Sequence, residues 1–378
     1  SPYYDSFHNL DIYAEAIYWK MDEPFLNFET VKGASGLGRA TFESSNYFSK
    51  PRYLKLQGID RVNPLIAIKN YATKYNVSDV SVQGLAEEMM LPQDQIIAML
   101  VTLSNRGFVI YERETRKARI KEKLFDYIDA VNEKIDYDVI QFNSESYGGQ
   151  NASLELDSFD LKLYGVKYFF LSDSQNVFIF PQSQQLIIKK GMDFTFSGRV
   201  HAGTFDFYAR SVNFNYEQFK LDMPVIDSMS FHVPSFETDE FGRRKQKKVR
   251  NVVSDLGGDL YIDDPNNKSG LKNFPKYPIF SSTKDAYVYY DDPSIFNGVY
   301  DREKFYFYLY PFTIDSLDNF KTELLQFEGY LASAGIFPDI EDTLRVQRDY
   351  SLGFETKTPE SGFDTYGGKG TYFADVRL

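Results

Sequence analysis

Acidic residues at neighbouring positions are the side chains of this sequence with the clearest capacity for catalysis. They occur in three groups: Asp263 and Asp264, Asp291 and Asp292, and Asp339 with Glu341 and Asp342. Glycoside hydrolysis uses two carboxyl groups about 5–10 Å apart across a cleft, one of them with a raised pKa. Adjacent aspartates before a proline more often begin turns, because their carboxylates bond nearby backbone amides. We therefore interpret these carboxylates as turn residues.

Residues for other common catalytic sites are scarce. The chain has three histidines, His8, His201 and His232, which are far apart in sequence, and it has no cysteine. The sequence contains no H-x-x-x-H spacing, no thiolate nucleophile, no Cys-based metal site and no P-loop. It therefore predicts no catalytic, cofactor-binding or metal-binding residue, and enzymatic function is disfavoured.

Residues 305–310 alternate two kinds of large side chain. One side would carry Phe305, Phe307 and Leu309, and the other Tyr306, Tyr308 and Tyr310. A central strand covered on both faces accounts for this pattern. A tyrosine platform for sugars or for a partner accounts for it as well, because tyrosine offers both a ring face and a hydroxyl. The three tyrosines are therefore candidate partner-contact residues.

The most concentrated positive charge lies in residues 243–250. Its candidate anion-contact residues are Arg243, Arg244, Lys245, Lys247 and Lys248. Such a patch could hold a phosphate, an acidic polysaccharide or a lipid headgroup. Three acidic residues precede it, Glu237, Asp239 and Glu240. A solvated hairpin with balanced charge is the favoured interpretation.

Alternating apolar residues predict that most of the chain forms β-strands. In residues 194–229 every second residue is apolar through four segments, which we expect to be strands at 194–196, 205–209, 212–216 and 219–223. Aromatic residues, which favour pleated and half-buried surfaces, make up 17% of the chain. Part of this region is repeated later, since residues 216–229 resemble residues 302–317. The repeats are unequally spaced, which favours repeated sheet modules over a strict solenoid.

Composition limits the classes of function. The 378 residues carry a formal net charge of -12, which argues against coating nucleic acid or an anionic membrane. No apolar run approaches the roughly 20 residues of a membrane helix, and no signal peptide is visible. The sequence starts at Ser1 and stops in a strand-like run, so we expect it to be a fragment of a longer protein.

Residues 63–136 differ from the rest because their apolar residues have helical spacing. Pro64 suits a first helical turn, Ser81 suits an N-cap, and Gly107 suits a helix end. Pro92 opens a third helix, and a charged turn then joins two short strands ahead of a last helix over residues 124–135. Through residues 81–88, 91–95 and 103–110, this region resembles the winged-helix domain, a helix-turn-helix variant with a β-hairpin wing.

The winged-helix resemblance implies DNA binding as one function, but the third helix lacks the required charge. Its outward positions include Gln95, Met99 and Thr102, none of which is a cation. Major-groove recognition normally uses Arg, Lys or Asn. We therefore expect these three residues to contact a protein partner, since an exposed methionine adapts to a protein surface.

The β segments resemble a family of very large, uncharacterised exported proteins of Bacteroidetes-type bacteria. The matching stretches are residues 194–203, 266–270, 312–317 and 366–370. This resemblance implies a location in the cell envelope, either the periplasm or the outer surface. It assigns no catalytic residue.

We expect a mainly β chain with an α+β insertion, in which repeated antiparallel or solenoid-like β-sheet modules flank a winged-helix domain. The expected domains are a β segment at 1–62, the winged helix at 63–136 and a β region at 137–378, which divides into modules at about 150–250 and 251–378. The leading function is a non-catalytic structural or interaction segment of a large exported envelope protein, with no cofactor. Its partner would be a protein or another part of the same long chain. The alternatives are a lipid-handling β groove and a DNA-binding regulator, and a glycan ligand is also compatible.

Overall fold

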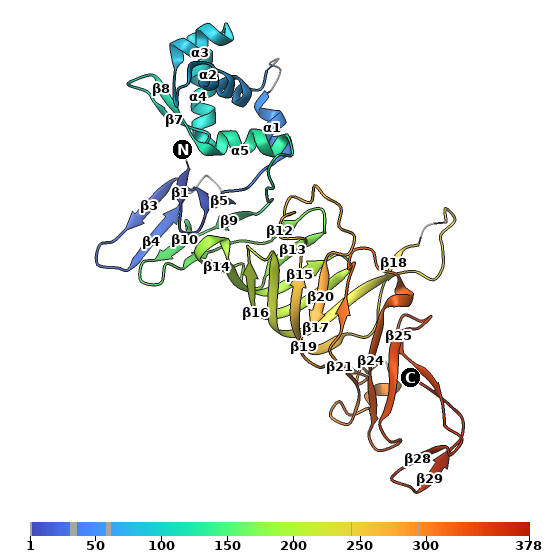
Figure 1. Ribbon diagram of the computed structural model, residues 1–378. Coiled ribbons are helices and arrows are strands. Elements are labelled where there is room, and N and C mark those ends of the chain that lie inside the picture. The colour runs from blue at the N-terminus through green and yellow to red at the C-terminus, as the bar shows by residue number, and fades with distance from the viewer. Residues whose placement is uncertain (1, 31–35, 58–61, 243, 294) are drawn as a thin grey trace. The chain divides into compact units, whose positions relative to one another are not determined.

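The computed structural model describes residues 2–30, 36–57, 62–242, 244–293 and 295–378 (Figure 1). The chain is mainly β, with 43% of residues in strands and 16% in helices, and its sheets are antiparallel. It divides into two compact units. Unit 1 holds residues 1–172, 184–193 and 266–272, and unit 2 holds residues 173–183, 194–265 and 273–378.

Outside its helical region, unit 1 has two groups of antiparallel strands. The first pairs its strands in the order β1 (Tyr3–Asp5), β2 (Leu10–Tyr13), β5 (Gly38–Ser44) and β9 (Gln141–Ser146). The second pairs β3 (Ala16–Trp19), β4 (Phe25–Glu29), β10 (Gln150–Glu155), β11 (Leu161–Leu163) and β14 (Leu186–Ile188) in that order. Unit 1 also holds β12 (Phe169–Ser172) and the short 3₁₀ helix η1 (Lys190–Met192). Phe42 pairs with Phe142 across the first sheet, and both are fully buried.

The α-helices of the described chain lie between residues 50 and 131, drawn from blue to green in Figure 1. They are α1 (Lys50–Gln57), α2 (Pro64–Tyr75), α3 (Val82–Met89), α4 (Gln93–Asn105) and α5 (Glu122–Val131). A small sheet accompanies them, with the order β6 (Asp79–Ser81), β8 (Lys117–Ile120) and β7 (Val109–Glu112). Leu65, Ile68, Leu85, Ile96, Leu100 and Leu103 are buried in the shared core.

Local capping explains where these helices begin and end. Asn63 precedes Pro64 and accepts a hydrogen bond from the amide of Leu65 at 3.0 Å. The predicted cap at Ser81 is confirmed, because its hydroxyl accepts from the amide of Gly84 at 3.0 Å. The prediction for the last helix was too long. It ends at Val131, so residue 135 lies beyond the helix.

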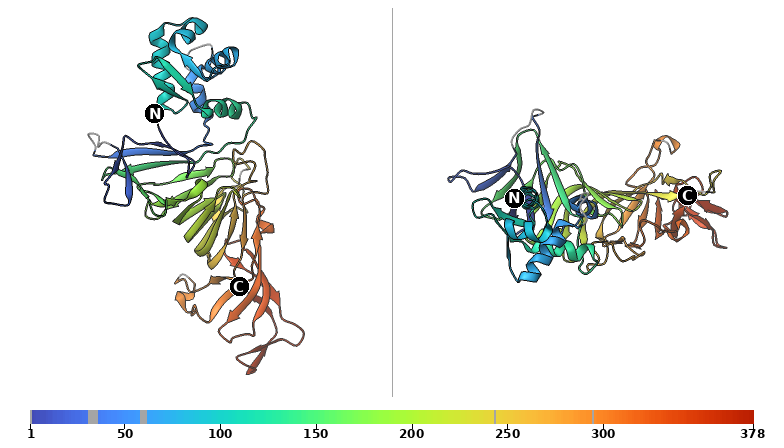
Figure 2. Two further views of the ribbon diagram at one scale, coloured as in Figure 1. Left: turned by 60° about the vertical axis from the view of Figure 1, so that its left-hand side comes forward. Right: turned by 90° about the horizontal axis from the view of Figure 1, so that it is seen from above.

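Unit 2 is built on long adjacent strands, which can be followed in Figures 1 and 2. The main sheet pairs β13 (Val177–Pro181), β15 (Phe194–Ala202), β16 (Phe205–Asn215), β17 (Lys220–Pro234) and β19 (Val253–Tyr261) in that order. The second half of β19 pairs with β20 (Ile279–Ser282), which pairs with β23 (Thr313–Ile314). The first half of β19 pairs with β21 (Ala286–Tyr289), which is followed by β22 (Phe305–Leu309), β24 (Gln326–Ser333), β25 (Ile340–Val346) and β26 (Leu352–Gly353).

Shorter elements complete unit 2. They are β18 (Gln246–Lys248), β27 (Glu355–Lys357), β28 (Phe363–Thr365), β29 (Gly370–Tyr372), β30 (Asp375–Arg377), η2 (Phe296–Gly298) and η3 (Thr322–Leu324). Strand β18 pairs with the end of β17, β27 pairs with β30, and β28 pairs with β29.

The predicted alternation in residues 194–229 is confirmed, but the predicted strand boundaries are not. The segments expected at 205–209 and 212–216 form one continuous strand, β16. Ser211 adopts a φ of 56°, and this local irregularity returns Val212 to the same buried side as Ala209. The buried aromatic rings pack on one another across strands, as in the pair Phe205 and Phe231 at 5.1 Å.

Within the described ranges, no helix has the length and apolar character needed to cross a membrane.

Candidate functional site

A cluster of tyrosines covers one side of neighbouring strands in unit 2. We call it the tyrosine face, and its residues are Tyr287, Tyr289, Tyr306, Tyr308, Tyr310 and Tyr330. The strand register places Tyr308 opposite Tyr287 on one side and opposite Tyr330 on the other. Three phenol rings from β21, β22 and β24 therefore form one row across the sheet.

The two sides of β22 differ in exposure. Phe305, Phe307 and Leu309 are buried, whereas Tyr306 and Tyr308 are half-buried and Tyr310 is 39% exposed. The structure therefore shows β22 covered on one side only. The phenylalanine side belongs to the core, and the tyrosine side is available at the surface of unit 2.

Contacts among the rings hold the tyrosine face in a defined geometry. Tyr287 and Tyr289 are nearly parallel, with an interplanar angle of 8° and centroids 5.7 Å apart. Tyr308 and Tyr330 stack at 4.9 Å, and Tyr308 meets Tyr287 edge-to-face at 5.5 Å. Because each ring restricts its neighbours, a ligand would pay little side-chain entropy to bind them.

Carboxylates fix two of the phenol groups. The hydroxyl of Tyr289 donates to Oδ2 of Asp255 at 2.9 Å, and burial together with this carboxylate raises the pKa of Tyr289 to about 12. A hydrogen bond to Asp285 raises the pKa of Tyr308 to about 12 as well. Both phenols are therefore uncharged at neutral pH, and because each proton is directed to a carboxylate, the hydroxyl oxygen is left as a hydrogen-bond acceptor.

A cavity of about 580 Å³ adjoins the tyrosine face at Tyr289. We call it the arginine pocket, and its principal lining residues are Arg250, Arg302, Arg377, Tyr289, Tyr290 and Phe305. The guanidinium of Arg302 lies 3.8 Å from the ring centroid of Tyr289 and 3.5 Å from the carboxylate of Asp291. The volume of the arginine pocket is in the range of small-molecule sites.

Each arginine of this pocket is paired with a carboxylate. Arg250 lies 3.3 Å from Asp349, and Arg377 lies 2.8 Å from Glu355. All three guanidinium groups are more than half exposed, so these pairs leave donors directed to solvent. The pocket combines an aromatic floor with arginine donors and carboxylate acceptors, an arrangement that suits a polyhydroxylated ring.

The acidic groups singled out in the sequence are dispersed. Asp263 is buried and accepts hydrogen bonds from Gln175 at 2.9 Å and from the backbone amide of Asp264 at 2.7 Å. Asp291 contributes to the arginine pocket, whereas Asp339 and Glu341 are exposed at β25. In the part of the chain that the structure describes, no group of three or more His, Asp or Glu is placed to hold a metal ion.

The histidines have structural partners. The Nδ1 atom of His8 lies 2.6 Å from Asp5, and its Nε2 atom lies 2.7 Å from the carbonyl oxygen of Phe159. His201 lies 3.0 Å from Asp206. His232 lies on β17, the strand next to β16, and its backbone amide donates to the carbonyl of Thr204 at 3.0 Å.

The predicted contact residues of α4 differ in their exposure to solvent. Gln95 and Thr102 are exposed, and the Thr102 hydroxyl donates to the carbonyl of Ala98 at 2.9 Å. The prediction of an exposed Met99 is wrong, because this side chain is half-buried and packs against the helical core. Its position follows from the neighbouring buried residues, Ile96 and Leu100.

The basic run forms a solvated hairpin, as predicted. Strand β18 pairs with the end of β17, and Arg244, Lys245, Lys247 and Lys248 are exposed. Arg243 lies outside the described residues.

A buried ion-pair cluster in unit 1 was missed by sequence reasoning. The ammonium of Lys123 on α5 donates to Asp11 on β2 and lies 3.8 Å from Oε2 of Glu43 on β5. Arg52 on α1 donates to Oε1 of Glu43 at 2.7 Å. The side chains of Asp11, Glu43 and Lys123 are 4%, 2% and 9% exposed. Arg52 of α1, Lys123 of α5 and Gln141 of β9 surround Glu43, and residues this far apart in sequence gave no local signal of the cluster.

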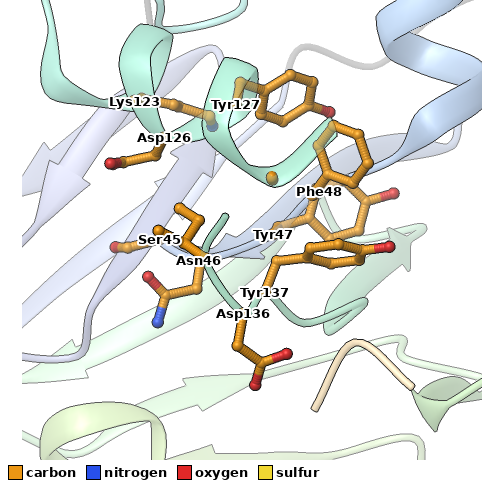
Figure 3. A pocket seen from close by; sticks show the side chains of 11 residues that line it. Ser45, Asn46, Tyr47, Phe48, Lys123, Asp126, Tyr127, Asp136 and Tyr137 are labelled. Atoms are coloured by element: carbon orange, nitrogen blue, oxygen red, sulfur yellow. The ribbon is translucent and has the colours of Figure 1, made fainter. Parts of the chain in front are cut away.

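A second feature of unit 1 is a small cavity beneath α5, shown in Figure 3. Its volume is about 20 Å³, which is room for a single water molecule. Phe48 meets Tyr127 and Tyr137 edge-to-face, each at a centroid distance of 4.7 Å. The cavity is therefore too small for an organic ligand.

Compared with protein-family models, curated proteins and solved structures, the chain matches none of them.

Proposed function

We propose that this chain is a non-catalytic interaction segment of a large exported cell-envelope protein, and that its tyrosine face binds a neutral polysaccharide. The observation that carries the proposal is the row of Tyr287, Tyr308 and Tyr330 on the uncovered side of a sheet whose other side is core. The repeated sheet modules serve as the framework that presents this face.

The chemistry of the face favours sugars over other ligands. Phenol hydroxyls donate and accept, the nearby carboxylates of Asp255 and Asp285 accept, and the rings offer apolar edges and faces to C–H groups. Carboxylates beside the face, together with a net charge of -12, disfavour an anionic polymer. The adjoining arginine pocket has matched cations and carboxylates and can take a sugar unit at one end of the face.

The helical region is proposed to contact protein. We assign residues 63–136 as a winged helix on the basis of their order of elements, three helices and a β-hairpin followed by a fourth helix. The exposed α4 residues Gln95 and Thr102 carry no charge, which supports a protein partner over DNA. Retention on heparin that weakens steeply with salt would instead favour DNA.

The alternative of a lipid-handling groove has less support. Phe205, Phe207 and Phe231 are fully buried, and their rings pack against other rings of unit 2. These apolar faces are therefore occupied by core packing, whereas a lipid groove would present them to an acyl chain.

Affinity electrophoresis in gels that contain a neutral or an acidic polysaccharide tests the proposal. Tyr308→Ala and Tyr330→Ala should each weaken binding to the neutral polymer about two- to tenfold, because an aromatic contact contributes about 0.5–1.5 kcal/mol. Tyr208→Ala removes an exposed tyrosine from β16 and is the matched control.

Three results would contradict the proposal. Equal retardation of the wild type and both variants would show that the tyrosine face does not bind the polymer. Preference for the acidic polymer would reject the neutral ligand. Release of reducing ends from a bound polysaccharide would reject a non-catalytic role.

A further inference from the structure

A groove in unit 1 lies beside the buried ion-pair cluster. It encloses about 490 Å³, and its polar lining includes Tyr13, Arg52, Lys55, Asn105, Arg106 and Gln141. These residues come from β2, α1, β9 and the C-terminal end of α4. We call it the unit 1 groove.

The positive charges around the groove exceed the negative ones. Glu43 lines the groove, and its Oε1 atom accepts from Arg52 and Gln141, each at 2.7 Å. With Asp11 neutralised by Lys123, the two carboxylates of the ion-pair cluster are matched by two cations. Among the described residues, Lys55 and Arg106 have no carboxylate within ion-pair distance, so two positive charges remain on a chain of net charge -12.

Hydrogen bonds hold the floor of the groove in place. The Tyr13 hydroxyl donates to the carbonyl of Arg106 at 3.1 Å and accepts from Lys123 at 3.3 Å. Burial and the carboxylates of Glu43 and Asp11 raise the pKa of Tyr13 far above its usual value. The phenol is therefore neutral and does not repel an anion, and the amides of Asn105 and Gln141 add neutral polar groups.

We propose that the unit 1 groove binds a compact oxyanion that carries a phosphoryl group, with Arg106 and Lys55 as its cationic contacts. An arginine fork pairs with two phosphate oxygens at once, and a lysine supplies a third charged donor. Two unmatched cations suit a dianionic group. The volume of the groove falls within the range of small-molecule sites.

Isothermal titration calorimetry of the whole chain with inorganic pyrophosphate tests this assignment. We expect saturable binding that weakens at least tenfold in Arg106→Gln and further in the double variant with Lys55→Gln. Lys245→Gln with Lys247→Gln removes the same charge from the exposed hairpin of unit 2 and is the control. Helical circular dichroism confirms that each variant is folded.

Further arms distinguish the ligand class. Adenosine diphosphate binding more tightly than pyrophosphate assigns an organic phosphate, and equal binding assigns the inorganic group; either result supports a phosphoryl site. Succinate binding as tightly as pyrophosphate rejects the phosphoryl assignment. An absence of saturable binding, or an equal loss of affinity in the unit 2 control, overturns the proposal.

Discussion

Replacing Lys123 with methionine tests whether the buried ion-pair cluster holds α5 to the first sheet of unit 1. The ammonium of Lys123 bonds Asp11 and also lies near Glu43 and Tyr13. Methionine keeps most of the apolar stem, so the cavity created is small and the dominant effect is the loss of charge. Asp11 would then be a 4% exposed carboxylate without its cation. Breaking such a pair costs about 3–5 kcal/mol.

The second step of this experiment replaces both partners. In Lys123→Met with Asp11→Leu, no carboxylate is left without its cation, because Arg52 still neutralises Glu43. Replacing a whole buried ion pair by apolar side chains is often neutral or stabilising. We therefore expect the double variant to recover most of the stability that Lys123→Met loses, with a coupling free energy of about 2 kcal/mol or more.

Urea denaturation followed by helical circular dichroism measures these changes for unit 1, because the described α-helices all belong to it. The control is Lys134→Met. This lysine is 64% exposed and lies 3.7 Å from Asp129, and such a surface pair contributes about 0–1 kcal/mol. The reasoning fails if Lys123→Met costs no more than Lys134→Met. It also fails if the double variant is as unstable as the sum of its single changes.

Three further changes test other parts of the structure. Gly329→Ala should loosen β24 from β22, because the new methyl would meet the backbone oxygen of Tyr308. The amides that pair these two strands should then exchange their hydrogens faster, and an unchanged exchange pattern would refute this. Leu100→Ala should lower the free energy of unfolding of unit 1 by about 2–5 kcal/mol in urea titrations, since this leucine is fully buried, and a loss below about 1 kcal/mol would contradict the packing. In the folded chain the pKa of Tyr289 and of Tyr308 is about 12, above the ordinary value of 10.0. The two protonated phenols therefore contribute their full stability below pH 10, and this contribution falls as the pH rises toward 12. If the tyrosinate absorbance of the folded chain titrates entirely near pH 10, the raised pKa values of these two tyrosines are refuted.

Local patterns predicted those parts of the fold that local interactions determine. The Ser81 cap depends on a residue and an amide three positions away, and the alternation of Phe205 and Phe207 reflects one strand. The merging of two expected strands into β16 could not be predicted, because it depends on the backbone conformation of Ser211. The alternation of apolar residues shows which side chains share a face of a strand, whereas the ends of the strand depend on its pairing with neighbouring strands.

The candidate sites show the same limit. The tyrosines of residues 306–310 were identified from alternation on one strand, but Tyr287 and Tyr330 were not. They join the face only because the registers of β21 and β24 place them opposite Tyr308. The unit 1 groove was beyond sequence reasoning for a related reason. Lys55 and Arg106 are 51 residues apart and meet only through the packing of helices against a sheet.

The contrast between the two sides of β22 supports the proposal that the tyrosine face binds a ligand. Phenylalanine and leucine fill the buried inner side, and tyrosine occupies the outer side at neighbouring positions of the same strand. On a side that only faces solvent, we would expect charged or small polar residues. On a side buried by another sheet, we would expect more phenylalanine. Tyrosine combines a large apolar area with a hydroxyl that bonds water in the free state and a polar ligand in the bound state. Five such rings on β21, β22 and β24, with Tyr310 directly after β22, therefore support the proposal that this surface exchanges solvent for a hydroxyl-rich ligand.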